Sequence, residues 1–139
     1  MVGAGPAGSS AARLAASQGL SVVLIDKRVG IGEPVQCAEF IPAPMGSYAN
    51  GVGIKIQSIK DMISEFSVDQ IETHTSRGII IDRAQFDRTL ADRAQQTGAT
   101  MQSSTSLLAL DRKSNTATLA AKFGLQKIEF KVLVAADGA

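Results

Sequence analysis

Near the start of the chain, a stretch with the composition of a helix is followed directly by a stretch with the composition of a strand. An apolar run at residues 21–25 has the composition of a buried parallel strand. The alanine-rich stretch from Ala7 to Gln18 favours a helix. Pro6 suits the first position of that helix, where its missing N–H costs nothing, and Gly19 suits the left-handed residue that ends it. The first 29 residues are therefore predicted to form a strand–helix–strand unit.

A second helix is predicted at residues 82–97, because apolar side chains recur there at helical spacing. Asp82 is placed to cap its N-terminus, Gln85 completes a capping-box pattern, and Gly98 is placed to end it. The apolar stripe consists of Phe86, Leu90, Ala91 and Ala94. Two pairs of opposite charges lie four residues apart on this helix: Arg83 with Asp87, and Arg88 with Asp92.

Alternating apolar and polar residues predict strands on both sides of this helix. Residues 54–73 alternate only partially and predict two or three short strands. After the helix, three segments separated by turn-forming residues are expected to form an antiparallel meander. They are 100–110, 116–122 and 126–131, and a buried strand is predicted at 132–136.

The residues between the first unit and these strands are rich in Gly and Pro. Residues 30–53 predict an irregular loop with room for a short helix. Such a long connection inside a compact domain is usually functional.

Composition and charge exclude several classes of function. The chain has 139 residues, of which 45% are hydrophobic and 19% charged, and its net charge of +1 gives no indication of nucleic-acid binding. No apolar run approaches the roughly 18–20 residues of a membrane span. A single cysteine, Cys37, excludes an internal disulfide and fits a cytoplasmic location. A single histidine, His74, leaves little for a metal cluster, so no metal is predicted.

Three glycines at the start of the chain carry the main chemical signal. Gly3, Gly5 and Gly8 stand in the sequence G-A-G-P-A-G, and Asp26 comes 18 positions after Gly8 at the end of the apolar run. Glycines at this spacing allow a tight turn, close approach to a pyrophosphate and close packing of the next helix. An acid at this distance accepts hydrogen bonds from a ribose. A transit peptide is disfavoured, because the stretch has one Arg and leads directly into a strand that ends in Asp.

The glycine turn alone does not separate NAD from FAD. Asp26 argues against a 2′-phosphate, whereas Lys27 and Arg28 beside it would accommodate one. The chain after Asp26 favours FAD, because a plain NAD-binding domain would continue with further strand–helix units. Here the chain continues with a long loop, a charged helix and an antiparallel meander.

Five segments of the chain form a recognisable set: G-A-G-P-A-G-S-S-A-A at 3–12, V-V-L-I-D-K at 22–27, P-V-Q-C-A-E at 34–39, I-D-R-A-Q-F-D-R-T-L-A at 81–91 and A-A-D-G-A at 135–139. With these segments, the chain resembles the FAD-binding half of the flavoprotein hydroxylase superfamily, and within it the geranylgeranyl reductase family. The resemblance covers nearly the whole chain. The glycine motif is generic, whereas the Cys-Ala-Glu stretch together with the Asp-Arg-x-x-Phe-Asp helix is more specific.

The resemblance implies a fold and a set of cofactor contacts. The implied fold is α/β. It begins with a Rossmann-like FAD-binding βαβ unit (1–29) and a cofactor loop (30–53), and continues with strands, a helix and an antiparallel β-meander (54–139). The fold is expected to be incomplete at both ends and to lack a substrate domain. The pyrophosphate would be held by Gly3, Gly5, Ala7 and Gly8, and the ribose by Asp26, with Lys27 beside it. The other implied contacts are Cys37 and Ala38 along the flavin, Arg83 from its helix, Leu107 near the adenine, and Asp137 and Gly138 at the pyrophosphate.

Several of these residues have plainer interpretations. Cys37 could be a small buried hydrophobe, Arg83 only the partner of Asp87, and Asp137 only a turn residue after a strand. The residue that protonates the substrate cannot be named from this chain.

The family reduces isolated double bonds of long isoprenoid chains through reduced FAD. The chain is accordingly interpreted as the N-terminal part of an FAD-dependent oxidoreductase, inactive by itself. The expected partners are an apolar substrate and an electron donor of the NAD(P)H or ferredoxin type, with peripheral membrane contact. Two alternatives stay open: an aromatic-ring monooxygenase of the same superfamily, and a nucleotide-binding remnant without catalysis.

Overall fold

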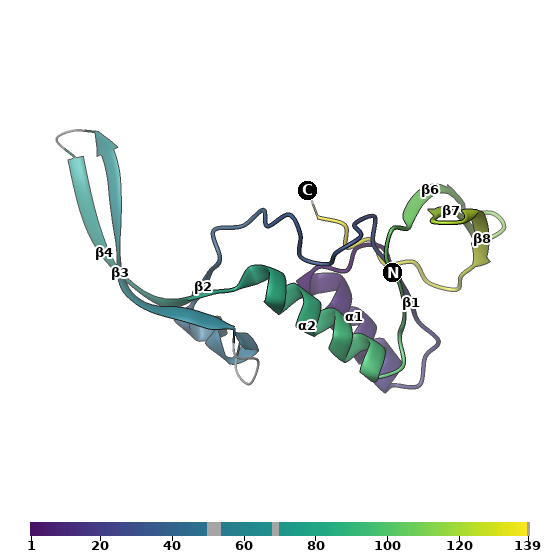
Figure 1. The fold of residues 1–139 in the computed structure, drawn as a ribbon, viewed down its shortest axis with the longest axis horizontal. Coiled ribbons are helices and arrows are strands. Elements are labelled where there is room, and N and C mark those ends of the chain that lie inside the picture. Colours follow the sequence, from purple (N-terminus) through teal and green to yellow (C-terminus); the bar gives the residue numbers. More distant parts are fainter. Residues whose placement is uncertain (50–53, 68–69, 139) are drawn as a thin grey trace. The chain divides into compact units, whose positions relative to one another are not determined.

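A computed structural model describes residues 1–49, 54–67 and 70–138 of the chain (Figure 1). The described chain divides into two compact units, Met1–Glu33 with Asp87–Ala139, and Pro34–Phe86. Residues 50–53 of the predicted cofactor loop (30–53) and Ala139 of the A-A-D-G-A segment lie outside the described residues.

The first unit is built on a small parallel sheet. Strand β1 (Val23–Ile25) pairs in parallel with β5 (Thr100–Gln102), and Val2 forms parallel bridges with both Ile25 and Ala135. The pairing order is therefore β5, β1, Val2 and Ala135. The parallel strand–helix–strand prediction is confirmed.

The strand predicted at 132–136 is wrong in its extent. Only Ala135 forms a bridge, and Val132 is 78% exposed. The reason is that Val2 alone pairs with this segment: its N–H donates to the carbonyl of Val134, and its carbonyl accepts from Ala136.

Two helices pack beside this sheet, and glycines end both as predicted. Helix α1 spans Pro6–Ser17, and α2 spans Arg83–Gln96, of which the residues from Asp87 onward belong to the first unit. After α1, Gly19 has φ +77° and donates to the carbonyl of Ala16, while Leu20 donates to that of Ala15. This is a Schellman motif. Gly98, with φ +111°, ends α2 in the same way.

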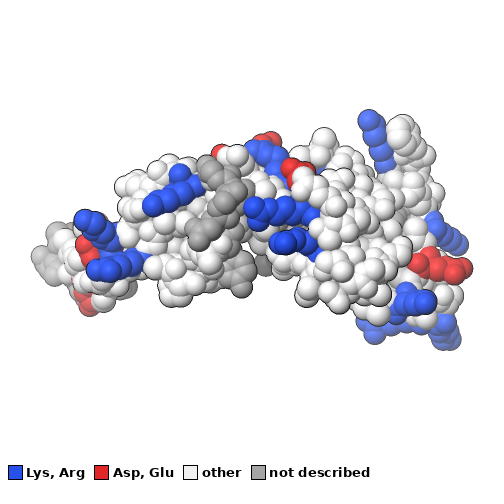
Figure 2. All heavy atoms as spheres, turned by 90° about the horizontal axis from the view of Figure 1, so that it is seen from below, with Lys and Arg blue, Asp and Glu red and all other residues white. Residues whose placement is uncertain are grey.

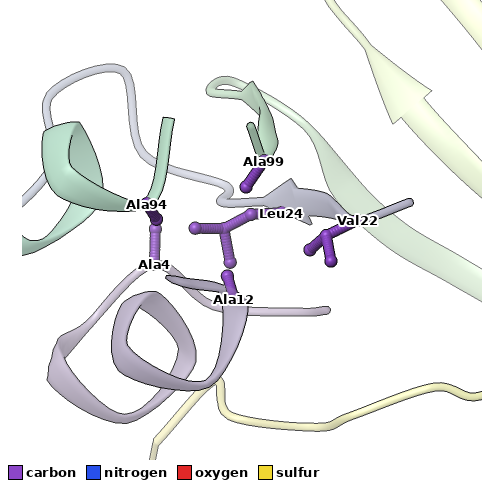
Figure 3. Close-up of a cluster of buried hydrophobic side chains, with 6 residues drawn as sticks. All are labelled: Ala4, Ala12, Val22, Leu24, Ala94 and Ala99. Atoms are coloured by element: carbon purple, nitrogen blue, oxygen red, sulfur yellow. The ribbon is translucent and has the colours of Figure 1, made fainter. Parts of the chain in front are cut away.

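Small side chains let these elements approach closely in the core of the first unit (Figure 3). Leu24 of β1 is fully buried among alanines of both helices and of the glycine turn. Burying a leucine side chain stabilises a fold by about 1.5–3 kcal/mol. The buried cluster consists of Ala4, Ala12, Val22, Leu24, Ala94 and Ala99.

An antiparallel meander comes after β5, in the order β6–β7–β8. Its strands are β6 (Ser106–Asp111), β7 (Thr116–Ala121) and β8 (Gly124–Glu129). Ala117 and Leu119 are buried and form a second core cluster with Ile25. The meander is confirmed, but the segment predicted at 100–110 is two strands in two sheets. Ser104, with φ +51°, lies in the bend that divides them.

The second unit is a three-stranded antiparallel sheet in the order β2–β4–β3. Its strands are β2 (Phe40–Pro42), β3 (Lys55–Ser67) and β4 (Gln70–Ile81), and the short helix expected in the loop is the 3-10 helix η1 (Ala43–Ala49). The two or three short strands predicted at 54–73 are instead one long hairpin. Irregularities in the register at three places along β3 explain why the sequence alternates only partially.

Candidate dinucleotide-binding site

The glycine turn leaves no space for side chains at two of its three glycines. Gly3 has φ +95°, and a Cβ there would lie 2.6 Å from the carbonyl carbon of Ala136. A Cβ at Gly8 would overlap the carbonyl oxygen of Gly3. Glycine is therefore required at both positions, at the first by conformation and space and at the third by close packing of α1.

Gly5 differs from its two neighbours in the motif. Its φ of −70° suits any residue, and no atom lies within 4 Å of the position that a Cβ would occupy. Gly5 is the N-cap of α1, and within the described chain no side chain caps this helix N-terminus. The N–H groups of the first turn and the positive end of the helix dipole can therefore meet an anion beside open space.

Asp26 connects the end of β1 to the glycine turn. The residue is only 8% exposed, and its Oδ2 accepts a hydrogen bond of 2.8 Å from the N–H of Ala4. Its Oδ1 accepts one of 2.8 Å from the N–H of Arg28. An ionised carboxylate has about four acceptor sites, so capacity for ribose hydroxyls remains.

The residues that come after β5 are bonded to the residues that come after β1. Thr105 is buried, and its N–H donates to the carbonyl of Asp26 at 2.8 Å. The N–H of Ser104 donates to the carbonyl of Arg28 at 2.9 Å. These bonds fix both loops at the carboxyl ends of neighbouring parallel strands, which is where α/β sheets bind ligands.

A pocket opens at this edge of the sheet. It is lined by Val2, Gly3, Asp26, Lys27, Arg28, Thr105, Ser106, Leu107 and Asp137. The structure thus brings together five residues that the sequence predicted to bind the cofactor: Gly3, Asp26, Lys27, Leu107 and Asp137. Asp137 is exposed, and Gly138 beside it has φ +80°.

Val2, Thr105 and Ser106 were not predicted as site residues from the sequence, and Arg28 was considered only as a base near a 2′-phosphate. The signal that could have found Thr105 and Ser106 is the run of hydroxyl residues Ser103–Ser106 directly after a parallel strand. Residues at the carboxyl end of such a strand are ligand candidates.

Three further predicted residues belong to the second unit. Cys37 and Ala38 are exposed in the loop before β2, so the interpretation of Cys37 as a small buried hydrophobe is wrong. Arg83 is half-buried at the start of α2. The cofactor contacts expected of these three residues stay predictions.

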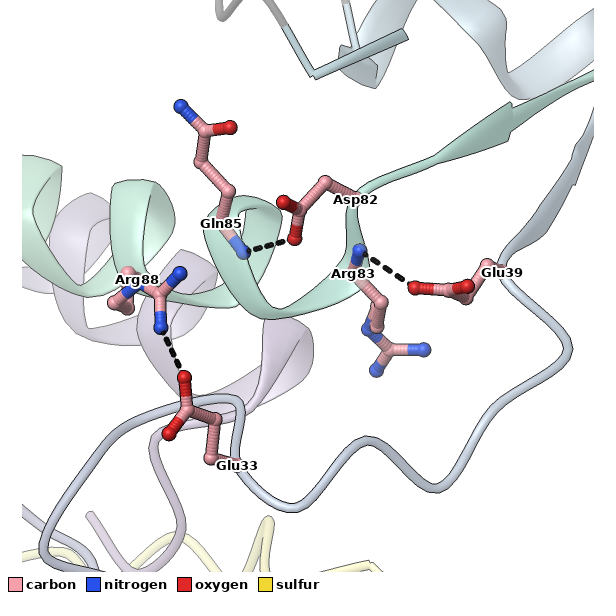
Figure 4. Close-up of polar contacts among 6 residues, drawn as sticks. All are labelled: Glu33, Glu39, Asp82, Arg83, Gln85 and Arg88. Carbon is pink, nitrogen blue, oxygen red and sulfur yellow. Dashed lines mark hydrogen bonds and ion pairs between the residues drawn. The ribbon is translucent and has the colours of Figure 1, made fainter. Parts of the chain in front are cut away.

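Two carboxylates occupy the N-terminus of α2 (Figure 4). Oδ1 of Asp82 accepts a 2.8 Å bond from the N–H of Gln85, as the capping pattern predicted. Oε1 of Glu39 accepts a 3.2 Å bond from the N–H of Arg83. Glu39 has φ +60°, a conformation that favours glycine, and its carbonyl also accepts from Ile81. This second cap was not predicted from the sequence, because Glu39 lies 44 residues before Arg83 and outside the local capping pattern.

Charges elsewhere are paired at the surface or dispersed. Arg88, expected to pair with Asp92, instead forms a 2.7 Å ion pair with Glu33, which is also shown in Figure 4. Both side chains are exposed, so the pair adds at most about 1 kcal/mol. On the face shown in Figure 2, Lys and Arg side chains are spread out rather than gathered into one patch.

The residues present fit a dinucleotide such as FAD. The open space at Gly5 lies beside an uncapped helix N-terminus, where a pyrophosphate needs close approach of the backbone. Asp26 lies in the pocket at the end of β1, where a ribose hydroxyl needs an acceptor.

Comparisons with known proteins agree with this geometry. Residues 1–42 match the model of the NAD(P)-binding Rossmann-like domain. The chain is 32% identical to the "Uncharacterized protein in nifH2 5′ region" of Methanosarcina barkeri, over 99% of the chain and 80% of that protein. It is 34% identical to the digeranylgeranylglycerophospholipid reductase of Methanothrix thermoacetophila, over 99% of the chain and 38% of the reductase.

The chain belongs to the geranylgeranyl reductase family. A solved geranylgeranyl bacteriochlorophyll reductase-like protein from Thermoplasma acidophilum superposes with a TM-score of 0.85 at 27% identity, over 99% of the chain and 38% of that protein. The p-nitrophenol 4-monooxygenase of Pseudomonas putida shares the fold with a TM-score of 0.72 at 12% identity, over 91% of the chain and 37% of the monooxygenase.

The chain thus spans less than two-fifths of the length of the family's named reductase from Methanothrix thermoacetophila. These similarities confirm the predicted resemblance to the geranylgeranyl reductase family and the predicted α/β fold, and they support FAD as the cofactor. None of the helices in the described part of the chain is long and apolar enough to cross a membrane.

Proposed function

We propose that the chain supplies the cofactor-binding part of an FAD-dependent reductase that acts on carbon–carbon double bonds of an isoprenoid lipid. The observation that carries the proposal is the open space at Gly5, beside the uncapped N-terminus of α1 and next to a turn that demands glycine. The similarity to digeranylgeranylglycerophospholipid reductases supports the substrate class.

In this proposal each part of the site has a separate task. The first turn of α1, including Ala7 and Gly8, binds the pyrophosphate through backbone N–H groups and the helix dipole. Asp26 accepts the ribose hydroxyls, and Leu107 offers backbone to the adenine end. Asp137 and Gly138 brace the turn from the other side.

The proposal also includes flavin contacts for residues outside the glycine turn. Cys37 and Ala38 lie along the flavin, and Arg83 reaches the cofactor from the start of α2. When bound, FAD supplies the electron pair for alkene reduction, whereas the protein binds, orients and excludes water. The donor that re-reduces the cofactor is of the NAD(P)H or ferredoxin type, and contact with the membrane is peripheral.

Calorimetric titration of the chain with FAD, NAD⁺ and NADP⁺ tests the cofactor. We expect saturable micromolar binding of FAD and weaker binding of NADP⁺, because the buried Asp26 carboxylate repels a 2′-phosphate. Preferential binding of NADP⁺ would mean that Lys27 and Arg28 decide the specificity, and would overturn the choice of FAD. Binding of none of the three would favour the remnant interpretation.

Mass spectrometry of a digeranylgeranyl lipid tests the reaction. The protein is incubated without oxygen with the lipid, FAD and dithionite. We expect products that carry two added hydrogens for each reduced double bond. Oxygen insertion into an aromatic compound, coupled to NADPH oxidation in air, would instead favour the monooxygenase alternative.

A further inference from the structure

The turn between β7 and β8 exposes an aromatic side chain that the fold does not use. Ala121 pairs with Gly124, so Lys122 and Phe123 form a two-residue loop at the end of the hairpin. Such loops favour Gly, Asn and Asp. Phe123 is nevertheless 93% exposed, and Leu125, just beyond the turn, is 72% exposed.

The strand register places further residues on the same outer face. Ala117 and Leu119 of β7 are buried, so the residues between and after them, Thr118 and Ala120, face outward. Thr118 is opposite Lys127, and Ala120 is opposite Leu125. The outer face of the hairpin therefore carries apolar residues near the turn, then Lys127, and then Glu129 at the far end of β8.

The charged residues nearest the turn of this hairpin are both lysines, Lys122 and Lys127. The hairpin's acidic residue, Glu129, lies at the far end of β8 opposite Thr116. Lys122 lies at the turn itself, with its Nζ 5.6 Å from the centre of the Phe123 ring. An apolar tip flanked by lysines suits the boundary of a bilayer, where the aromatic ring enters the interface and the amines reach lipid phosphates.

We propose that the β7–β8 hairpin docks on a bilayer that contains anionic phospholipid. Phe123 and Leu125 enter the interfacial layer, and Lys122 and Lys127 contact phosphates. A bilayer fits better than a protein partner, because a stable protein interface buries about 800 Å² on each side. One phenylalanine and one leucine at a narrow turn offer far less.

The docking surface lies at the same end of the meander as the pocket. Ser106, which lines the pocket, is opposite Ala120, and Ala120 is also opposite Leu125. Docking there would bring the cofactor site close to the lipid surface. The role of this contact in catalysis rests on the proposed function, because it assumes a lipid substrate. The contact itself is inferred from the exposed residues of the hairpin alone.

Flotation of the purified chain with vesicles tests the proposal. One set of vesicles contains phosphatidylcholine alone. The other contains phosphatidylcholine with about 30% phosphatidylglycerol, which gives the surface a negative charge like that of an anionic biological leaflet. We expect binding to the anionic vesicles and at least tenfold weaker binding to the neutral ones. Raising the salt to about 1 M should release the chain, because the screening length falls to about 3 Å.

Two variants locate the contact, and each has a matched control. Phe123→Ser and Lys122→Glu should each lower the partition coefficient onto anionic vesicles by about tenfold or more. Val29→Ser, which removes another highly exposed apolar side chain, and Lys113→Glu, which reverses a charge in the β6–β7 turn, should change it less than threefold.

Circular dichroism and FAD titration of every variant separate this test from the proposed function. Vesicle binding without FAD binding would leave the docking surface standing and refute the cofactor site. FAD binding with equal vesicle binding by all variants would refute the docking surface. Concentration-dependent self-association that Phe123→Ser abolishes, without vesicle binding, would assign the tip to contact between copies of the chain.

Discussion

The two helices of this chain begin in opposite ways. At the N-terminus of α1 stands a glycine with open space beside it, and no side chain in the described chain caps the helix. At the N-terminus of α2, the carboxylates of Asp82 and Glu39 accept hydrogen bonds from the backbone of Gln85 and Arg83. Two of the N–H groups at the start of α2 are thus bonded to carboxylates of the chain, whereas at α1 we propose that a ligand takes this place.

In the proposed function, this difference distinguishes a helix start that binds the cofactor from one that only stabilises the fold. Both helix starts carry the positive end of a dipole, so the dipole alone does not identify an anion site. The start of α2 already holds two negative groups. The start of α1 instead follows a turn in which Gly3 admits no side chain, and Gly8 in the first turn of α1 admits none either. Variants that alter one helix start or its supports at a time can test this difference.

The largest expected effect comes from closing the packing space under α1. In Gly8→Ala, the new methyl group would overlap the carbonyl oxygen of Gly3, and backbone cannot yield as a side chain could. We expect the free energy of unfolding to fall by about 3 kcal/mol, measured by urea denaturation. Gly5→Ala is the matched control and should change it by less than about 0.5 kcal/mol. Equal losses in both would contradict the packing role of Gly8.

Asp26→Asn should weaken both stability and cofactor binding. The amide group of Asn can accept only one of the two bonds that the carboxylate accepts from the N–H groups of Ala4 and Arg28. A buried N–H left unpaired costs about 1–3 kcal/mol. Thermal unfolding measures this loss, and titration with FAD should show affinity at least tenfold lower. Unchanged stability would show that the carboxylate does not brace the glycine turn.

Removing a cap from α2 should affect stability alone. Asp82→Ala leaves the N–H of Gln85 without its 2.8 Å partner, and loss of an N-cap costs about 1 kcal/mol. Asp82→Asn, which keeps a capping oxygen, should restore most of that loss in the same denaturation assay. FAD affinity should stay within threefold of the wild type. A large loss of affinity in Asp82→Ala would mean that the start of α2 takes part in binding.

The smallest expected effect is on the pH dependence of the free energy of unfolding, through Asp111 in the β6–β7 turn. This turn lies far from either helix start in the sequence. The hydroxyl of Ser114 and the N–H groups of Lys113 and Ser114 lower the pKa of Asp111 below its usual value. The stabilisation is therefore complete above the ordinary aspartate pKa of about 4 and is lost as pH falls through the lower folded-state value. The stability difference between wild type and Asp111→Asn should shrink below about pH 4. A difference independent of pH would refute this.

Local sequence signals predicted the parts of the fold that depend on neighbouring residues. Pro6, Gly19 and Gly98 correctly marked helix ends. The structure also displays the tight turn predicted at Gly3 and the close packing predicted at Gly8, whereas the approach of a pyrophosphate at Gly5 stays a prediction. These signals succeed because backbone conformation and short-range sterics are encoded within a few residues.

Features that depend on distant pairing were not predictable. The hairpin of β3 and β4 appeared as short strands because its bulges interrupt the alternation. The second cap of α2 comes from Glu39, which lies 44 residues before Arg83. The extent of pairing at Ala135 is set by Val2, at the other end of the chain. In each case the partner lies far away in sequence, so no local pattern records it.

The central claim is that the open space at Gly5 receives the pyrophosphate of FAD, and comparison of wild type with Gly5→Val tests it most directly. Calorimetric titration with FAD, together with thermal unfolding of the free proteins, gives both quantities. We predict affinity lowered at least about a hundredfold, or roughly 2.7 kcal/mol. The free protein should unfold at nearly the same temperature, because nothing lies within 4 Å of the new Cβ. Equal FAD binding by both proteins would contradict the claim.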